Sequence, residues 1–121
     1  MPFWDDVSLS SLPDLSGELM LVDVFDGPQR FRFSTVGNTI SKRHGTPLAG
    51  TFSDELEPKS PLHFFNAQAS MTVEARTSTF YRHESGSHAG SADPGYSRLI
   101  LPLWGNGRVG MLLGGFSLGE P

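Results

Sequence analysis

Three glycines near the end of the chain have the spacing of a phosphate-binding loop. Gly105, Gly107 and Gly110 stand in "WGNGRVG" as G-x-G-x-x-G. In dinucleotide-binding proteins this loop follows a strand and opens a helix, whose N-terminus holds the pyrophosphate. Here the stretch "RVGMLLGGFSL" follows, and each glycine in it costs a helix about 1 kcal/mol relative to alanine. The motif therefore predicts the tip of a β-hairpin, where glycine and asparagine accept positive φ angles.

Histidines are the next candidates for chemistry. His83 and His88, with Glu84 and Asp93 nearby, are residue types that bind metal ions. They lie in or beside a Gly/Ser-rich loop without a third anchored ligand, so we interpret them as solvated loop residues and expect no metal site. His63 opens a predicted helix and could ligate haem iron from inside a cavity. We interpret it instead as a surface or capping histidine.

Acidic residues cluster at Asp54, Glu55 and Glu57. Paired carboxylates can perform acid–base catalysis, but these three lie where a short predicted helix begins and ends, and solvation explains them. The chain also lacks G-x-S-x-G, Walker and H-E-x-x-H motifs. We therefore expect no catalytic residues and no enzyme.

Length and charge narrow the class of protein further. The chain has 121 residues, which predicts a single domain. It carries 13 acidic residues against 9 lysines and arginines, without a basic block, so we expect no nucleic-acid partner. It has no cysteine, which excludes disulfides, thiolate metal ligands and cysteine nucleophiles. Without a signal peptide or a membrane-length apolar run, we expect a cytoplasmic protein with no membrane partner.

The first half of the chain predicts a β-hairpin followed by helices. Residues 18–25 are apolar and partly β-branched, Asp26-Gly27 favours a turn, and Phe31 and Phe33 then alternate with polar residues. Glycines and prolines between 38 and 58 leave room for one or two short helical turns. The longest helix is predicted from Ser60, as N-cap, to about Arg76. Its apolar stripe is Leu62, Phe65, Ala69 and Val73, widened by Phe64 and Met71.

The second half predicts three strands. They cover residues 77–84, 96–104 and 108–118, with a long loop at 85–95 after the first. We expect the space between the sheet and the long helix to form the core and a candidate ligand pocket. The residues assigned to this pocket are Phe33, Phe65, Met71, Leu101 and Met111. The opposite sheet face is assigned Ile100, Leu112 and Phe116.

This order of elements resembles that of a PAS domain, and more specifically the PAS_5 family of short PAS-domain proteins of alphaproteobacteria. The resemblance rests on "LPDLSGELMLVDV", "RFRFSTVGNTI", "GTPLAGTF" and, most specifically, "YSRLILPLWGNGRVGMLLGG". It covers about residues 10–117. It implies an α+β fold, with a PAS-like domain at 11–118 that has a five-stranded antiparallel sheet with short helices and one longer helix on one face. Residues 1–10 would form an N-terminal arm or short helix, and Pro102 a bulge or unpaired position.

The resemblance also implies a function. PAS domains sense small molecules or dock partners, and some hold haem, flavin or metabolites between the sheet and the long helix. The absence of cysteine excludes a cysteinyl-flavin adduct and a thioester-linked chromophore; the cofactor is otherwise unknown. We expect a stand-alone sensory or regulatory module, not an enzyme, that signals through contact with another signalling protein. The alternative is a dedicated sensor of haem or of a small metabolite.

The apolar residues of the N-terminal arm suggest a homodimer. Phe3, Trp4 and Val7 precede the predicted domain and are large side chains for a solvated arm. They are assigned to a dimer contact because a symmetric pair is the commonest assembly of small soluble proteins. The alternative is that the arm packs on its own core.

Overall fold

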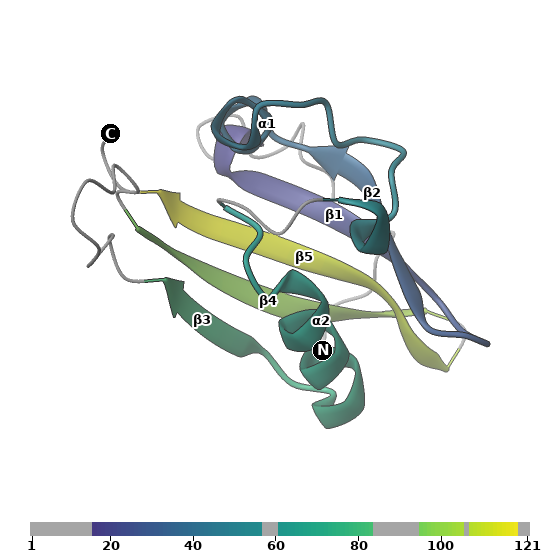
Figure 1. Ribbon diagram of the computed structural model, residues 1–121. Coiled ribbons are helices and arrows are strands. Elements are labelled where there is room, and N and C mark those ends of the chain that lie inside the picture. The colour runs from purple at the N-terminus through teal and green to yellow at the C-terminus, as the bar shows by residue number, and fades with distance from the viewer. Residues whose placement is uncertain (1–15, 57–60, 84–94, 106, 119–121) are drawn as a thin grey trace.

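The computed structural model describes residues 16–56, 61–83, 95–105 and 107–118. The strands form one antiparallel sheet in the order β2-β1-β5-β4-β3 (Figure 1). In chain order, the elements are η3 (Ser16–Glu18), β1 (Leu19–Phe25), β2 (Arg30–Val36), α1 (Asn38–His44), η4 (Ser53–Glu55), α2 (Phe65–Ala75), β3 (Thr79–His83), β4 (Tyr96–Gly105) and β5 (Arg108–Leu118). The predicted α+β fold with a five-stranded antiparallel sheet is confirmed.

Both predicted hairpins are present. Strands β1 and β2 pair on either side of a turn in which Gly27 has a φ of 67°. Strands β4 and β5 pair through Gly105 and Arg108, and Gly107 between them has a φ of 77°. The glycine motif therefore forms a turn between two strands, because the stretch after it continues as β5 and not as a helix. Asn106 lies outside the described residues.

Pro102 is paired within the sheet, which differs from the expected bulge or unpaired position. Pro102 aligns with Leu112 of β5, and the register shift lies one residue further on, between Leu103 and Trp104. A bulge of this kind lets one strand carry an extra residue and bends it locally. The prediction of a bulge or an unpaired position at Pro102 is thus wrong, and the irregularity lies beside it.

The helices cover one face of the sheet, and this face carries the core. Helix α2 lies against β3 and β4, and η4 lies against β2 (Figure 1). The buried apolar residues of the sheet on this side are Met20, Val22, Val24, Phe31, Phe33, Ile100, Leu112 and Phe116. The assignment of Ile100, Leu112 and Phe116 to the opposite face is therefore wrong.

The opposite face is also apolar, and it carries the leucines. Leu21, Leu113 and Leu101 are in register across β1, β5 and β4, and all three are half-buried. Leu99 and Phe80 are paired across β4 and β3 on the same face, and their exposed fractions are 42% and 64%. We call this surface, made of Leu19, Leu21, Phe80, Leu99, Leu101, Leu103, Met111 and Leu113, the outer face. Of these residues Leu103 is the buried one, with an exposed fraction of 1%.

Helix α2 begins four residues later than predicted, at Phe65 and not at Pro61. Ser60 lies outside the described residues, and residues 61–64 form turns in place of the first helical turn. The physical reason is that the carbonyl oxygens of Pro61 and His63 accept hydrogen bonds from the guanidinium of Arg98. Carbonyls held toward the sheet in this way are not available to a helix that starts at Pro61.

Candidate functional site: a cavity beside α2 and the Arg98 network

A cavity of about 290 Å³ lies between β2, η4 and the start of α2. Most of its wall is apolar, and Ser53 and Asn66 add a hydroxyl and an amide. None of the described residues that line it is charged. Its apolar residues are Phe33, Leu56, Leu62, Phe64, Phe65 and Ala67.

The wall on the η4 side is attached to the edge of the sheet by backbone hydrogen bonds. The amide of Phe33 donates to the carbonyl of Thr51 over 2.9 Å, and the amide of Gly50 donates to the carbonyl of Phe33 over 2.7 Å. Arg32 and Phe52 form an isolated bridge next to them. Residues 50–52 thus follow β2 as a short additional strand and hold η4 over the cavity.

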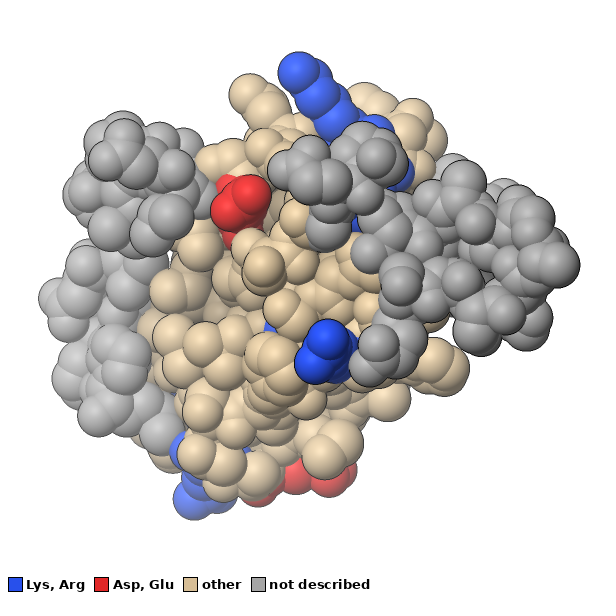
Figure 2. Space-filling view, turned by 90° about the vertical axis from the view of Figure 1, so that its left-hand side faces the viewer, with Lys and Arg blue, Asp and Glu red and all other residues tan. Residues whose placement is uncertain are grey.

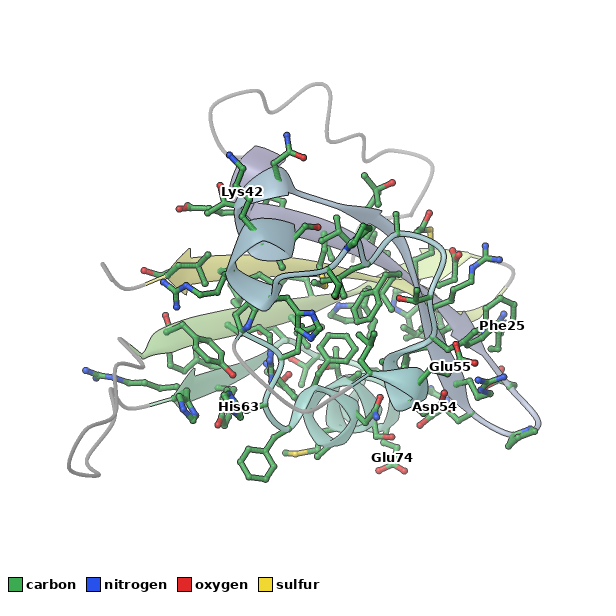
Figure 3. The ribbon with its side chains drawn as sticks, turned by 45° about the horizontal axis from the view of Figure 1, so that its top comes forward. Phe25, Lys42, Asp54, Glu55, His63 and Glu74 are labelled. Atoms are coloured by element: carbon green, nitrogen blue, oxygen red, sulfur yellow. The ribbon has the colours of Figure 1, made fainter. Side chains whose placement is uncertain are left out.

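An ion pair fixes η4 from the solvent side. Arg30 donates from Nε and Nη2 to the two carboxylate oxygens of Asp54, over 2.8 and 2.9 Å, and its guanidinium lies 3.8 Å from the centre of the Phe52 ring. The hydrogen bond from Arg30 lowers the pKa of Asp54 below its ordinary value. Asp54 and Glu55 lie on the side of the molecule toward Phe25 and the β1–β2 hairpin (Figure 3).

This ion pair predicts a pH-dependent effect of Asp54→Asn. Because folding lowers the carboxyl pKa, the paired carboxylate stabilises the fold above pH of about 4, and this contribution disappears as the pH falls through the folded-state value. In low salt, the variant should unfold at a lower urea concentration than the wild type at pH 7, and this difference should shrink as the pH falls below about 4. Glu74→Gln, an exposed carboxylate on α2, is the control. A difference that does not change with pH would contradict the assignment.

The two polar groups of the cavity come from different elements. The hydroxyl of Ser53, at the start of η4, is hydrogen-bonded to the side-chain carbonyl of Asn66, in the first turn of α2. Ser53 is buried and Asn66 is exposed. This contact joins the two walls of the cavity and leaves the amide nitrogen of Asn66 as a donor at its edge.

Arg98 of β4 is a fully buried cation under the start of α2. Its Nε donates to Oε1 of Gln68 over 2.6 Å, Nη1 to the carbonyl of Pro61 over 3.0 Å, and Nη2 to the carbonyl of His63 over 2.8 Å. These three acceptors are neutral. Burial lowers the pKa of Arg98 to about 10, although Tyr96 and Tyr81 oppose the shift, so the side chain remains charged at neutral pH.

Gln68 and aromatic rings complete this network, which we call the Arg98 network. The side-chain amide of Gln68 donates to the carbonyls of Thr79 and Arg98 over 3.0 and 3.1 Å. The guanidinium carbon of Arg98 lies 4.9 Å from the centre of the Tyr81 ring and 5.4 Å from that of Phe65. The network therefore ties α2 and the turns before it to β3 and β4, and Phe65 separates it from the cavity.

Comparison with known structures agrees with this architecture. A sensory box sensor histidine kinase from Vibrio cholerae has a similar structure, with a TM-score of 0.60 and 16% sequence identity over 93% of this chain and 90% of that chain. The chain has a PAS-like fold. At this identity the likeness concerns the fold alone. No family model and no curated protein sequence matches the chain, so membership of PAS_5 stays a prediction.

Haem was a candidate ligand of this PAS-like fold through His63, and the residues present do not fit it. His63 is not among the described residues that line the cavity. It is half-buried, its ring is stacked on that of His83 at 4.1 Å, and its Nδ1 lies 2.9 Å from the hydroxyl of Tyr96 (Figure 3). His63 is thus a half-buried residue of the turn before α2 that packs against His83 and Tyr96.

His83 is also part of a strand and not of a loop. It is the last residue of β3 and is half-buried, and its Nδ1 lies 3.1 Å from the hydroxyl of Tyr81. The interpretation of His83 as a solvated loop residue is thus wrong, whereas His88 lies outside the described residues. Among the described residues, no three side chains of His, Cys, Asp or Glu gather as they would around a metal ion.

Two of the five residues assigned to the pocket line the cavity of this PAS-like fold. These are Phe33 and Phe65. Met71 is 60% exposed on α2, so its assignment is wrong. Leu101 and Met111 lie on the outer face, so their assignment is wrong as well. The arm residues Phe3, Trp4 and Val7, assigned to a dimer contact, lie outside the described residues.

Charge and hydropathy of the surface give two further observations. On the side of the molecule seen in Figure 2, the described lysines and arginines stand singly among uncharged residues. Within the described part of the chain, no helix has the length and apolar character needed to cross a bilayer.

Proposed function

We propose that the protein is a sensory or regulatory module of the PAS type that acts through protein–protein contact and is not an enzyme. The observation that carries this proposal is the outer face of the sheet. Its leucines point away from the core that α2 covers, and Leu99 and Phe80 are 42% and 64% exposed. Exposed apolar patches on small soluble proteins commonly mark interaction sites.

The occupant of the outer face that we propose is a second copy of the chain. A two-fold axis through this sheet face places the same leucines of both copies against each other. Leu101 and Leu113 at the centre of the face would then become buried, which would remove apolar area from water. The apolar arm residues Phe3, Trp4 and Val7 are assigned to the same contact. We propose in addition that the protein contacts a further signalling protein and that it is located in the cytoplasm.

Light scattering of two charge variants tests the contact. At micromolar concentration, the wild type should have twice the mass of one chain, and Leu99→Glu should have the mass of one chain, because the new carboxylate would lose its water in the contact. Met71→Glu places the same charge on an equally apolar, exposed position of α2 and should keep the doubled mass. A wild type with the mass of one chain, or the same mass for both variants, would overturn the proposal.

A second candidate function is a small-molecule sensor, and the cavity is the observation that favours it. At about 290 Å³ the cavity is at the lower limit of pockets for drug-sized ligands, which begin at roughly 300 Å³. A small metabolite is therefore the ligand of this candidate, and haem is not. The two functions are compatible, because the cavity and the outer face lie on opposite sides of the sheet.

A further inference from the structure

We propose that the cavity binds a small neutral ligand with one or two rings and a hydrogen-bonding group, and that Phe64 closes its mouth. This inference rests on the second candidate function, that the cavity holds a ligand. Three observations support it: the size of the cavity, the kind of side chains that line the cavity, and the backbone conformation of Phe64.

The volume of the cavity limits the number of atoms in its ligand. An apolar protein cavity of about 150 Å³ is large enough to bind benzene. The cavity here is about 290 Å³, which is roughly twice that volume. It therefore has room for one ring with a substituent or for two fused rings, and it is too small for a ligand with several ring systems.

The side chains that line the cavity determine the polarity of the ligand that it can bind. Phe33 and Phe65 lie 5.3 Å apart with tilted rings, and together with Leu56 and Leu62 they form apolar walls. A charged group among these walls would lose its water without gaining a partner, which costs several kcal/mol. Ser53 and Asn66 offer a hydroxyl and an amide at one place, so a single neutral polar group of the ligand can bind there.

Phe64 combines three properties that suit a gate. It lines the cavity, 67% of it is exposed, and it has a φ of 57° and a ψ of 23° at the N-cap of α2. A large side chain rarely adopts the left-handed region, and such strain concentrates at ligand clamps and switch regions. Its ring lies outside the packed core and touches Tyr81 edge-on at 5.9 Å, so movement of the ring would uncover the cavity.

Arg76 provides a matched control for this backbone conformation. It has the same φ of 57° at the other end of α2, where it ends the helix, and it is not among the described residues that line the cavity. Substitution by glycine relieves the same backbone strain at both positions. Only the substitution at Phe64 should change the cavity.

The experiment is an NMR titration of the full chain with benzyl alcohol, benzoate and benzylammonium. These probes share one ring and differ in charge. Benzyl alcohol should bind with saturable shifts at Phe65 and Ala67, and the two ions should bind at least about tenfold more weakly. No saturable binding of benzyl alcohol, or equal binding of an ion, would overturn the proposed ligand class. Neither result bears on the doubled mass that tests contact through the outer face.

Three variants test the roles of the residues. Phe64→Gly should raise the dissociation rate of benzyl alcohol, measured from NMR line shapes, by about tenfold or more, while Arg76→Gly leaves it unchanged. Ser53→Ala should weaken the binding of benzyl alcohol by about three- to tenfold, which is the effect of one hydrogen bond. The same variant should leave the affinity for toluene unchanged. Equal effects of the two glycine variants would overturn the gate, and equal weakening of toluene would overturn the hydrogen bond to Ser53.

Discussion

Replacement of Arg98 by alanine is expected to lower the free energy of unfolding by about 3–5 kcal/mol. The substitution leaves the carbonyls of Pro61 and His63 and the side-chain oxygen of Gln68 without the donors that they have in the fold. Unfolding in urea, followed by circular dichroism, measures the loss. It should be the largest effect of any arginine substitution among the described residues, because Arg98 is the one that is fully buried.

A second substitution at Arg98 separates the shape of the side chain from its charge, and a substitution at Arg108 is the exposed control. Arg98→Lys keeps the charge, but one ammonium group lacks the planar arrangement of donors that reaches three acceptors, so most of the loss should remain. Arg108→Ala removes an exposed arginine that pairs with Asp26 over 3.2 Å, and it should change stability by less than about 1 kcal/mol. A loss below about 1 kcal/mol for Arg98→Ala would mean that the Arg98 network does not hold α2 to the sheet.

Replacement of Phe65 by alanine is expected to cost about 3–4 kcal/mol. The ring is 4% exposed and lies between the Phe33 ring, at 5.3 Å, and the Arg98 guanidinium, at 5.4 Å. Its removal would leave a hole that joins the existing cavity, and the sheet below cannot move to fill it. The free energy of unfolding in urea measures this cost.

The neighbouring Phe64→Ala is the matched control for Phe65→Ala. It removes a ring of the same size from the next position, but this ring is 67% exposed. Its cost should be below about 1 kcal/mol, since little apolar area returns to water. Equal losses for the two variants would show that Phe65 is not part of the packed core.

The strands could be predicted from local sequence because their signals are local. Turn residues such as Asp26-Gly27 and Gly107 fix where a chain reverses, and alternation in Phe31 and Phe33 fixes which side is buried. These features depend on neighbours in sequence, and the structure confirms the two hairpins.

The assignment of the two faces of β4 failed for a physical reason. Leu101 was expected to face the helices because alternation places it on the apolar side of its strand with Leu99 and Leu103, opposite Tyr96 and Arg98. In the structure Arg98 is buried, because Gln68 and the carbonyls of Pro61 and His63 satisfy its donors. These acceptors are 30 or more positions away in sequence, so no local pattern indicates them.

The cavity could be predicted only in part for the same reason. Phe33 and Phe65 were found because each lies on the apolar side of a regular element. Ser53 and Asn66 were missed, since a serine and an asparagine in loops and helix starts are ordinary solvated or capping residues. Their contact across 13 positions depends on the path of residues 50–56 along β2.

Sedimentation equilibrium of the wild-type chain at micromolar concentration is the measurement that tests the central claim most directly. That claim is that the molecule acts through contact between copies at the outer face of the sheet, with the cavity on the other side free for a ligand. The account predicts a mass of twice that of one chain, falling to the single mass on dilution with one dissociation constant. A single-chain mass at micromolar concentration would contradict it.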